Sequence, residues 1–300
     1  MSVETVAKNL PPQFIHTKLI DRFVITMVIN DLPRFIESIP INLPRAFEQE
    51  FAEKMHNQAK GVVPIIVASH TSHMDALPLA KTAKMLVEIN HCFSDINQLQ
   101  GFVIPVASSM ATGHQGSVVK EGTERMQQIV SQKYHLEAVP YTRHRDTEKY
   151  GLKRDNNVSS MLNLVRKVKE RHGIAIFPEA TMQAGRIKKN GLPNATERYG
   201  MQEFKDMEGI TRIVSLAGKE PLYIPVGIDG GFRLESPDNN RPTLAYLGEI
   251  FLSRPAETKL VSVRVGLPIT REGLGDQNIN DFLGKKVAML LPQEARGVYA

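Results

Sequence analysis

Three short polar clusters carry the residue types that acid–base and anion-binding chemistry require. The first is Ser69-His70-Thr71-Ser72-His73-Met74-Asp75, the second runs from Phe177 to Thr181, and the third runs from Pro140 to Asp146. A histidine beside a carboxylate can act as a general base, and an arginine fork can hold a phosphate through two hydrogen bonds. Each cluster directly follows a short apolar run. The clusters are therefore candidate site segments.

His70 and Asp75 are the candidate base and its partner. Five helical steps turn the chain by about 500°, so the two side chains would point apart on one continuous helix. They can meet if His70 lies in a loop and Asp75 in the first helical turn, and Ser72-x-x-Asp75 has the pattern of a capping box with Ser72 at the N-cap. The positive end of the helix would keep Asp75 ionised, able to orient and stabilise an imidazolium ring.

Two alternatives apply to this first cluster. Asp75 could be only a cap residue and His70 only a hydrogen-bonded loop histidine. His70, His73 and Asp75 could also bind a metal ion, but their H-x-x-H-x-D spacing departs from the H-x-H-x-D-H pattern of metallohydrolases. A single cysteine, Cys92, excludes an intrachain disulfide and a thiolate zinc site. We expect no metal and no cofactor.

The elements that must position these clusters alternate between strand and helix. Apolar runs predict strands at 62–69, 102–107, 136–140, 174–177, 222–228 and 261–265, and periodicity predicts helices at 75–89, 118–133, 157–171, 201–217 and 278–292. This alternation predicts an α/β fold: a mixed, largely parallel central sheet with helices on both faces. Sites in such folds lie at the carboxyl ends of strands, where the three clusters fall.

The N-terminal region has a different pattern. Helical spacing at 13–38 and again from Pro44 to about Lys60 predicts a small helical appendage. We therefore divide the chain into an N-terminal helical segment, 1–60, and an α/β domain, 61–300. The first eleven residues are polar or proline-containing, which predicts no secretory signal, and no apolar run approaches the roughly 18 residues of a membrane span. We expect a cytoplasmic protein, soluble or peripheral to a membrane.

The positive charge is concentrated in one region, residues 143–189, here called the basic zone. It holds twelve Lys and Arg against five Asp and Glu, a net charge of +7 in a chain of net charge +5. A zone of this kind predicts an anionic partner, although any single lysine in it could be only a solvated surface residue. Few aromatic residues lie in the zone and the chain has no Trp, so a base-stacking surface is not supported. We expect no nucleic-acid partner.

Together these clusters resemble the glycerol-phosphate and lysophosphatidate acyltransferases. His70 to Asp75 resembles the H-x-S-x-x-D first block of that family, and Phe177 to Thr181 resembles its F-P-E-G-T block. Tyr141-Thr142-Arg143 falls where the family has its arginine block, and 223–228 and 263–269 are similar to its late strand elements. Ala180 replaces the family's glycine, and Met182 replaces the arginine that often follows.

The resemblance implies transfer of a fatty acyl group from acyl-CoA or acyl carrier protein to a hydroxyl of glycerol 3-phosphate or lysophosphatidate. It implies His70 as the base and Asp75 as its partner. The remaining implied site residues bind substrates: Arg143, Arg145, Glu179, Thr181 and Arg186 the phosphorylated acceptor, and Lys188 and Lys189 the acyl thioester. A hydrolase using the same His–Asp pair and a non-catalytic binder of anionic membrane surfaces remain the alternatives.

Overall fold

The sheet at the centre of the molecule is built from eight strands in the described part of the chain. The computed structural model describes residues 30–56, 61–70, 75–94, 98–107, 117–141, 156–179, 200–205, 207–230 and 261–300. The strands are β1 (Ile41–Asn42), β2 (Val62–Ala68), β3 (Gly101–Ala107), β4 (Leu136–Tyr141), β5 (His172–Ile176), β6 (Glu220–Asp229), β7 (Ser262–Val265) and β8 (Ile269–Thr270). Their order in the sheet is β1-β7-β6-β2-β5-β3-β4, with β8 also paired to β6.

Five neighbouring strands form the parallel part of the sheet. β6, β2, β5, β3 and β4 pair parallel to one another, whereas β7 and β8 pair antiparallel to β6. The predicted mixed, largely parallel sheet is therefore confirmed. Strand β5 lies between β2 and β3, so the chain returns to the middle of the sheet after building β3 and β4. This return places the carboxyl end of β5 beside that of β2.

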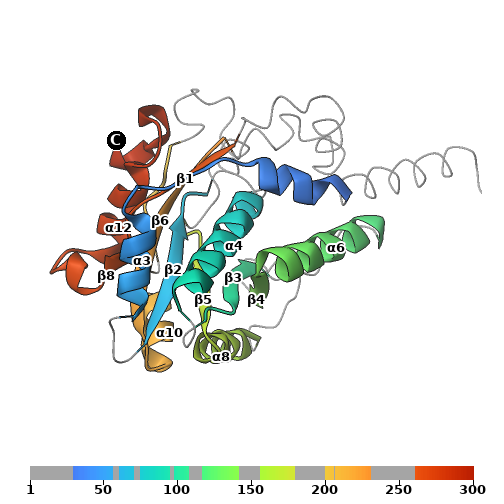
Figure 1. Cartoon of the computed structure of the whole chain (residues 1–300), viewed down its shortest axis with the longest axis horizontal. Coiled ribbons are helices and arrows are strands. Elements are labelled where there is room, and N and C mark those ends of the chain that lie inside the picture. Colours follow the sequence, from blue (N-terminus) through green and yellow to red (C-terminus); the bar gives the residue numbers. More distant parts are fainter. Residues whose placement is uncertain are drawn as a thin grey trace, which may run out of the picture.

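Helices cover both faces of the sheet (Figure 1). The longer helices are α3 (Phe47–His56), α4 (Ala76–Phe93), α6 (Ser117–Tyr134), α8 (Asn156–Lys169), α10 (Met207–Leu216) and α12 (Ile279–Ala288). Three short 3₁₀ turns lie in the C-terminal part: η4 (Glu272–Leu274), η5 (Gln293–Ala295) and η6 (Gly297–Tyr299). Residues 30–38 are also helical.

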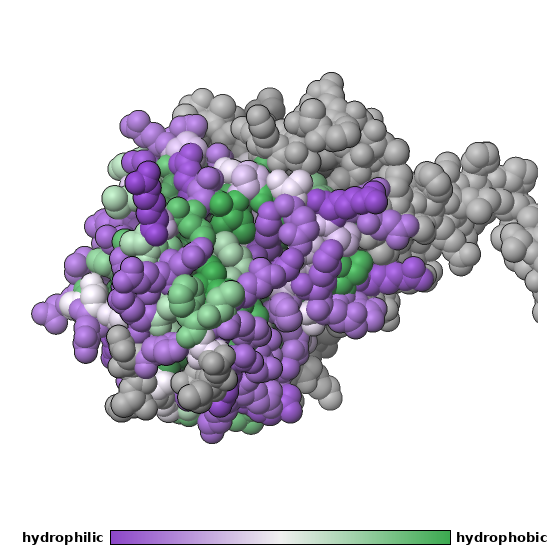
Figure 2. Space-filling model, viewed as in Figure 1, coloured by the Kyte–Doolittle hydropathy of each residue, from purple (hydrophilic) through white to green (hydrophobic). Residues whose placement is uncertain are grey.

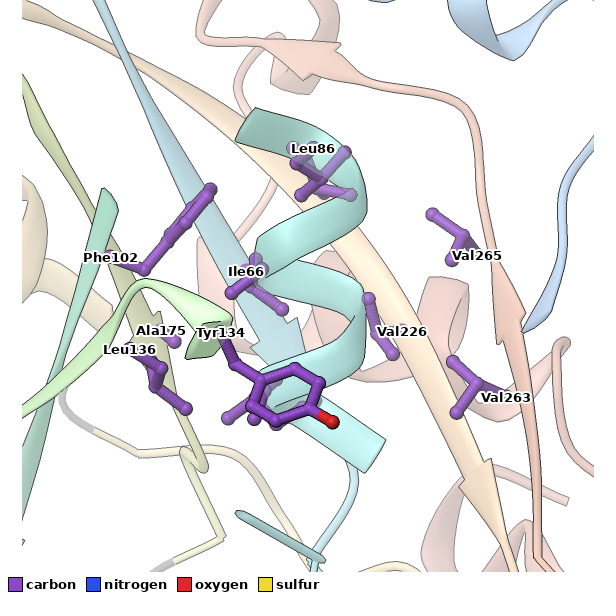
Figure 3. Close-up of a cluster of buried hydrophobic side chains, with 14 of the residues drawn as sticks. Ile66, Leu86, Phe102, Tyr134, Leu136, Ala175, Val226, Val263 and Val265 are labelled. Carbon is purple, nitrogen blue, oxygen red and sulfur yellow. The ribbon is translucent and has the colours of Figure 1, made fainter. Parts of the chain in front are cut away.

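Alternating side chains of β2 supply two separate hydrophobic cores. Ile66 and Ala68 face the core that includes α3, α4 and Tyr134 at the end of α6. Ile65 and Val67 face the core that α8, α10 and α12 close. Figure 3 shows the first core, with Ile66, Phe102, Ala175 and Val226 from four strands on the α4 side. A strand buried on both faces needs a continuous apolar run, and this is the pattern of residues 62–68.

Residues 30–56 belong to the same sheet and core as the rest of the described chain. β1 pairs parallel to β7, and Leu32, Ile36, Phe47 and Phe51 are buried in the core of α4. Hydrophilic side chains cover most of the face that carries α3 and α4, with apolar ones gathered near its middle (Figure 2). Residues 1–29 lie outside the described residues, so the division at residue 60 stays a prediction.

Two predicted helices are shorter than their sequence patterns. The helix predicted at 278–292 ends at Ala288 as α12, and the larger difference is in the helix before it. The prediction covered 201–217, but α10 begins at Met207, and residues 200–205 are non-helical with an isolated antiparallel bridge from Phe204 to Glu179. The physical reason is that the backbone groups of this segment bond to other segments of the chain. Met201 N–H donates to Ala295 O, and Lys205 N–H donates to Pro178 O, both at 3.0 Å. We refer to residues 200–205 as the bridge segment.

Candidate active site

The pairing of β2 with β5 brings two of the predicted clusters together. In this parallel pair Val67 is opposite Ile176, and His70 and Glu179 each lie three residues further along their own chain segments. His70 N–H donates to Glu179 Oε1 at 2.9 Å, across 109 residues of sequence. The two clusters therefore meet at the carboxyl edge of the parallel sheet.

His70 and Asp75 form a side-chain pair. His70 Nδ1 lies 3.3 Å from Asp75 Oδ2, and the Asp75 side chain is fully buried while that of His70 is 17% exposed. Asp75 sits at the N-cap position of α4 without a side-chain cap hydrogen bond, and its carboxylate lies beside the His70 ring. With Nδ1–H donating to the carboxylate, Nε2 is the ring nitrogen that can accept a proton.

The loop and helix start explain why this pair forms. β2 ends at Ala68, so His70 has left the strand, and α4 begins at Ala76, one residue after Asp75. The predicted arrangement, with His70 in the loop after the strand and Asp75 at the helix start, therefore occurs. Ser72 and His73 lie outside the described residues.

Phe177 supports the imidazole ring from one side. The His70 and Phe177 rings are stacked, with centroids 4.2 Å apart and planes 17° from parallel. Phe177 follows directly after β5, so the strand that supplies Glu179 also supplies this contact. Offset aromatic stacking restricts the rotation of the histidine ring. Sequence analysis placed Phe177 inside a site cluster but gave it no role.

Ser69 anchors the residue before the histidine. Its N–H donates to Val226 O at 3.2 Å, and its Oγ accepts from Ile228 N–H at 2.9 Å and donates to Ile228 O at 3.3 Å. The hydroxyl thus continues the β2–β6 ladder past the end of β2. The main chain at His70 is consequently held from β6 through Ser69 and from β5 through Glu179. No periodicity in the sequence indicated this contact, because it joins residues 159 positions apart.

Glu179 binds main-chain groups on two segments. Oε1 accepts from His70 N–H, and Oε2 accepts from Gln202 N–H, both at 2.9 Å. The residue is 3% exposed. Sequence analysis grouped Glu179 with the acceptor-binding residues; in the structure its carboxylate joins the His70 loop to the bridge segment.

The other predicted substrate-binding residues lie outside the described residues. These are Arg143, Arg145, Thr181, Arg186, Lys188 and Lys189. Within the described ranges, no group of three or more His, Cys, Asp or Glu side chains has an arrangement that could hold a metal ion. None of the helices described is both long and apolar enough to cross a membrane.

Comparisons with known proteins give a likeness to solved structures but no sequence match. No family model matches the chain, and no curated protein sequence does either. Among solved structures, the chain is similar to the 1-acyl-sn-glycerophosphate (LPA) acyltransferase PlsC from Thermotoga maritima, with 12% sequence identity and a TM-score of 0.38. The likeness covers 87% of this chain and 78% of that one.

Proposed function

We propose that this protein is an O-acyltransferase of glycerolipid synthesis, with His70 as general base and Asp75 as its partner. The proposed donor is acyl-CoA or acyl carrier protein, and the proposed acceptor is a hydroxyl of glycerol 3-phosphate or lysophosphatidate. The observation that carries the proposal is the 3.3 Å contact between His70 Nδ1 and the buried Asp75 carboxylate at the carboxyl edge of the sheet. The order of the sequence blocks supports the same assignment.

The geometry suits direct transfer without a covalent intermediate. Nε2 of His70 takes the proton of the acceptor hydroxyl while that oxygen attacks the thioester carbonyl carbon. Asp75 accepts from Nδ1–H and stabilises the imidazolium ion that forms. When the C–S bond breaks, the thiolate leaves with the electron pair and takes the proton from Nε2. The ester and the free thiol are the products, and the histidine returns to its starting state.

A stacked and doubly anchored histidine suits this reaction. A general base must hold its lone pair in line with the proton that it removes, and a small displacement of the base lowers the reaction rate. Phe177 holds the ring by stacking, and Ser69 and Glu179 hold the main chain on either side of it. In the proposal, Arg143, Arg145, Thr181 and Arg186 bind the phosphorylated acceptor, and Lys188 and Lys189 the thioester.

The decisive experiment is an assay with defined products. The purified chain is incubated with acyl-CoA or acyl carrier protein thioesters and with glycerol 3-phosphate, lysophosphatidate and unphosphorylated glycerol. We expect a new ester on a phosphorylated acceptor, formed in equal amount to the released thiol. Thiol release with free fatty acid and no acylated acceptor would instead show a hydrolase that uses the same His–Asp pair.

A further inference from the structure

The carboxylate of Glu179 is one link in a longer series of contacts. Its two oxygens join His70 N–H to Gln202 N–H, so the position of the histidine loop depends on the bridge segment. Hydrogen bonds to a charged acceptor are stronger than neutral ones, and burial removes competing water. The Glu179 carboxylate therefore couples the main chain at Gln202 to the main chain at His70, so that a shift of one is felt by the other.

The bridge segment is in turn held by the turns η5 and η6. Met201 N–H donates to Ala295 O and Val298 N–H donates to Met201 O, each at 3.0 Å. Phe204 N–H donates to the Tyr299 hydroxyl at 2.9 Å. Three hydrogen bonds thus fix residues on both sides of Gln202, the residue that binds Glu179.

Two glycines allow η6 to pack closely against the bridge segment and against α12. Gly297 has φ of 57°, and a Cβ there would overlap the main chain of Met201. A Cβ on Gly284 of α12 would overlap the ring of Tyr299. The Tyr299 ring also meets Phe204 edge-on, with centroids 6.0 Å apart and planes at 74°. Burial raises the pKa of the Tyr299 phenol above its ordinary value. Tyr299 therefore packs closely between α12 and the bridge segment.

We propose that Tyr299 and Glu179 are positioning residues for His70. Tyr299 fixes Phe204, the bridge segment fixes Gln202, and Gln202 and His70 share the Glu179 carboxylate. Removal of either link lets the His70 main chain move away from the geometry that the base requires. The catalytic part of this inference rests on the proposed acyl transfer, whereas the physical coupling of Tyr299 to His70 does not.

The test uses the full-length chain with Tyr299→Phe and Glu179→Gln. Tyr299→Phe removes only the hydroxyl, and Glu179→Gln leaves an amide that can accept only one of the two N–H groups. Tyr223→Phe is the matched control, because Tyr223 is a buried tyrosine whose hydroxyl likewise has a hydrogen-bond partner, Thr211 Oγ1, 2.8 Å away. Amide hydrogen exchange at His70 and Gln202 is measured by NMR, and kcat and KM are measured for acyl transfer.

We expect Tyr299→Phe to speed amide exchange at His70 and Gln202 about fivefold, since one hydrogen bond contributes about 1 kcal/mol. Glu179→Gln should increase the exchange rate at these two amides further. It should also lower kcat about tenfold with little change in KM, because the interaction that is lost matters in the transition state more than in substrate binding. Tyr223→Phe should lower the melting temperature but leave exchange at His70 and kcat unchanged.

Exchange at His70 that stays at the wild-type rate in Tyr299→Phe would overturn the coupling. Faster exchange with unchanged kcat would overturn the positioning role. If the wild-type chain acylates none of the acceptors, the proposed function fails, and the exchange rates still decide whether Tyr299 holds the His70 loop.

Discussion

His70 and Asp75 are expected to act as one unit. His70→Ala should lower acyl transfer about 100-fold or more, because general-base catalysis contributes 10²–10⁴ in rate, and the fold should survive because His70 lies in a loop. Asp75→Asn should lower the rate of acyl transfer by a similar factor, since a neutral amide cannot stabilise the imidazolium charge. Initial rates with a thiol-release assay measure both variants. His56→Ala is the control, because His56 is an exposed histidine at the end of α3. Near-normal turnover by a folded His70→Ala protein would refute the mechanism.

Acyl transfer by this mechanism should need no metal ion. The step uses a base and a thiolate leaving group, and it needs no Lewis acid to make the nucleophile. We expect dialysis against a strong chelator to leave kcat and KM unchanged. Metal content is measured in the same sample before and after dialysis. Stoichiometric zinc that leaves together with the activity would contradict the prediction and return His73 to consideration as a ligand.

Proximity of site residues could be predicted from the sequence where the information was local. His70 and Asp75 are five residues apart, between the end of a strand and the start of a helix, and both boundaries can be read from neighbouring residues. The contacts of Glu179 and Phe177 with His70 could not be read in this way. They depend on β5 returning to lie beside β2, and a strand order of this kind is set by long-range packing.

Strand β5 approaches β3 closely through a glycine. A Cβ on Gly173 would overlap the ring of Phe102 and the carbonyl of Pro64, on the two neighbouring strands. Gly173→Ala should therefore lower the free energy of unfolding by about 1–3 kcal/mol, as overpacking of a core does. Gly209→Ala in α10 is the matched control, because nothing lies within 4 Å of its added Cβ. It should raise stability by about 0.5–1 kcal/mol.

Urea unfolding, followed by far-UV circular dichroism, measures both variants. Gly173→Ala should also reduce acyl transfer if β5 moves, because β5 leads into Phe177 and Glu179. If Gly173→Ala has the same free energy of unfolding as wild type, the close approach of β3 and β5 does not contribute to stability, and the prediction is wrong.

His172 at the start of β5 is expected to make stability depend on pH. Burial, followed by the nearby charge of Lys167, lowers the pKa of His172, and its Nδ1–H donates to Lys167 O at 3.2 Å. The unfolded chain, with a histidine pKa of about 6.5, then binds more protons than the folded chain as the pH falls below this value. The stability contribution of the neutral ring is present above about pH 6.5 and is lost as the pH falls toward the lowered folded-state pKa.

His172→Gln should therefore lose less stability than wild type between pH 7 and pH 5. Urea midpoints at the two pH values give the comparison, with His56→Gln as an exposed-histidine control. An equal loss in wild type and His172→Gln would show that His172 does not titrate differently on folding.

At the scale of elements, the sequence predicted the type of fold but not every boundary. Strands with continuous apolar runs, such as β2 and β6, were found because both faces of each are buried. β1 and β8, with two residues each, are too short to produce a pattern. The shortened α10 has another cause. Residues 200–205 have helical spacing, but Glu179, Ala295 and Tyr299 bind their backbone N–H groups, and these partners are distant in sequence.

Over the whole molecule, α8 is the described part of the basic zone that combines charge with exposed apolar side chains. It carries Arg166, Lys167 and Lys169 and no acidic residue within its bounds. Val158, Met161 and Leu162 are exposed on the same helix. A helix with aliphatic and cationic side chains on its outer surface suits the interface of an anionic membrane. If the protein binds a membrane peripherally, as the sequence predicts, we expect this surface to make the contact.

We expect the chain to sediment with phosphatidylglycerol-containing vesicles and not with pure phosphatidylcholine vesicles. Arg166→Gln/Lys169→Gln should weaken this binding about thirtyfold, because each of the two cations near an anionic surface contributes about 1 kcal/mol. Added salt should also weaken wild-type binding. Lys285→Gln/Lys286→Gln removes equal charge from α12 and should change binding less. Equal loss in both double variants would mean that net charge alone attracts the membrane, and no binding to either vesicle would remove the membrane contact. Arg143, in the same basic zone, is assigned to the acceptor, so Arg143→Ala should raise the KM for a phosphorylated acceptor about tenfold, corresponding to about 1.4 kcal/mol.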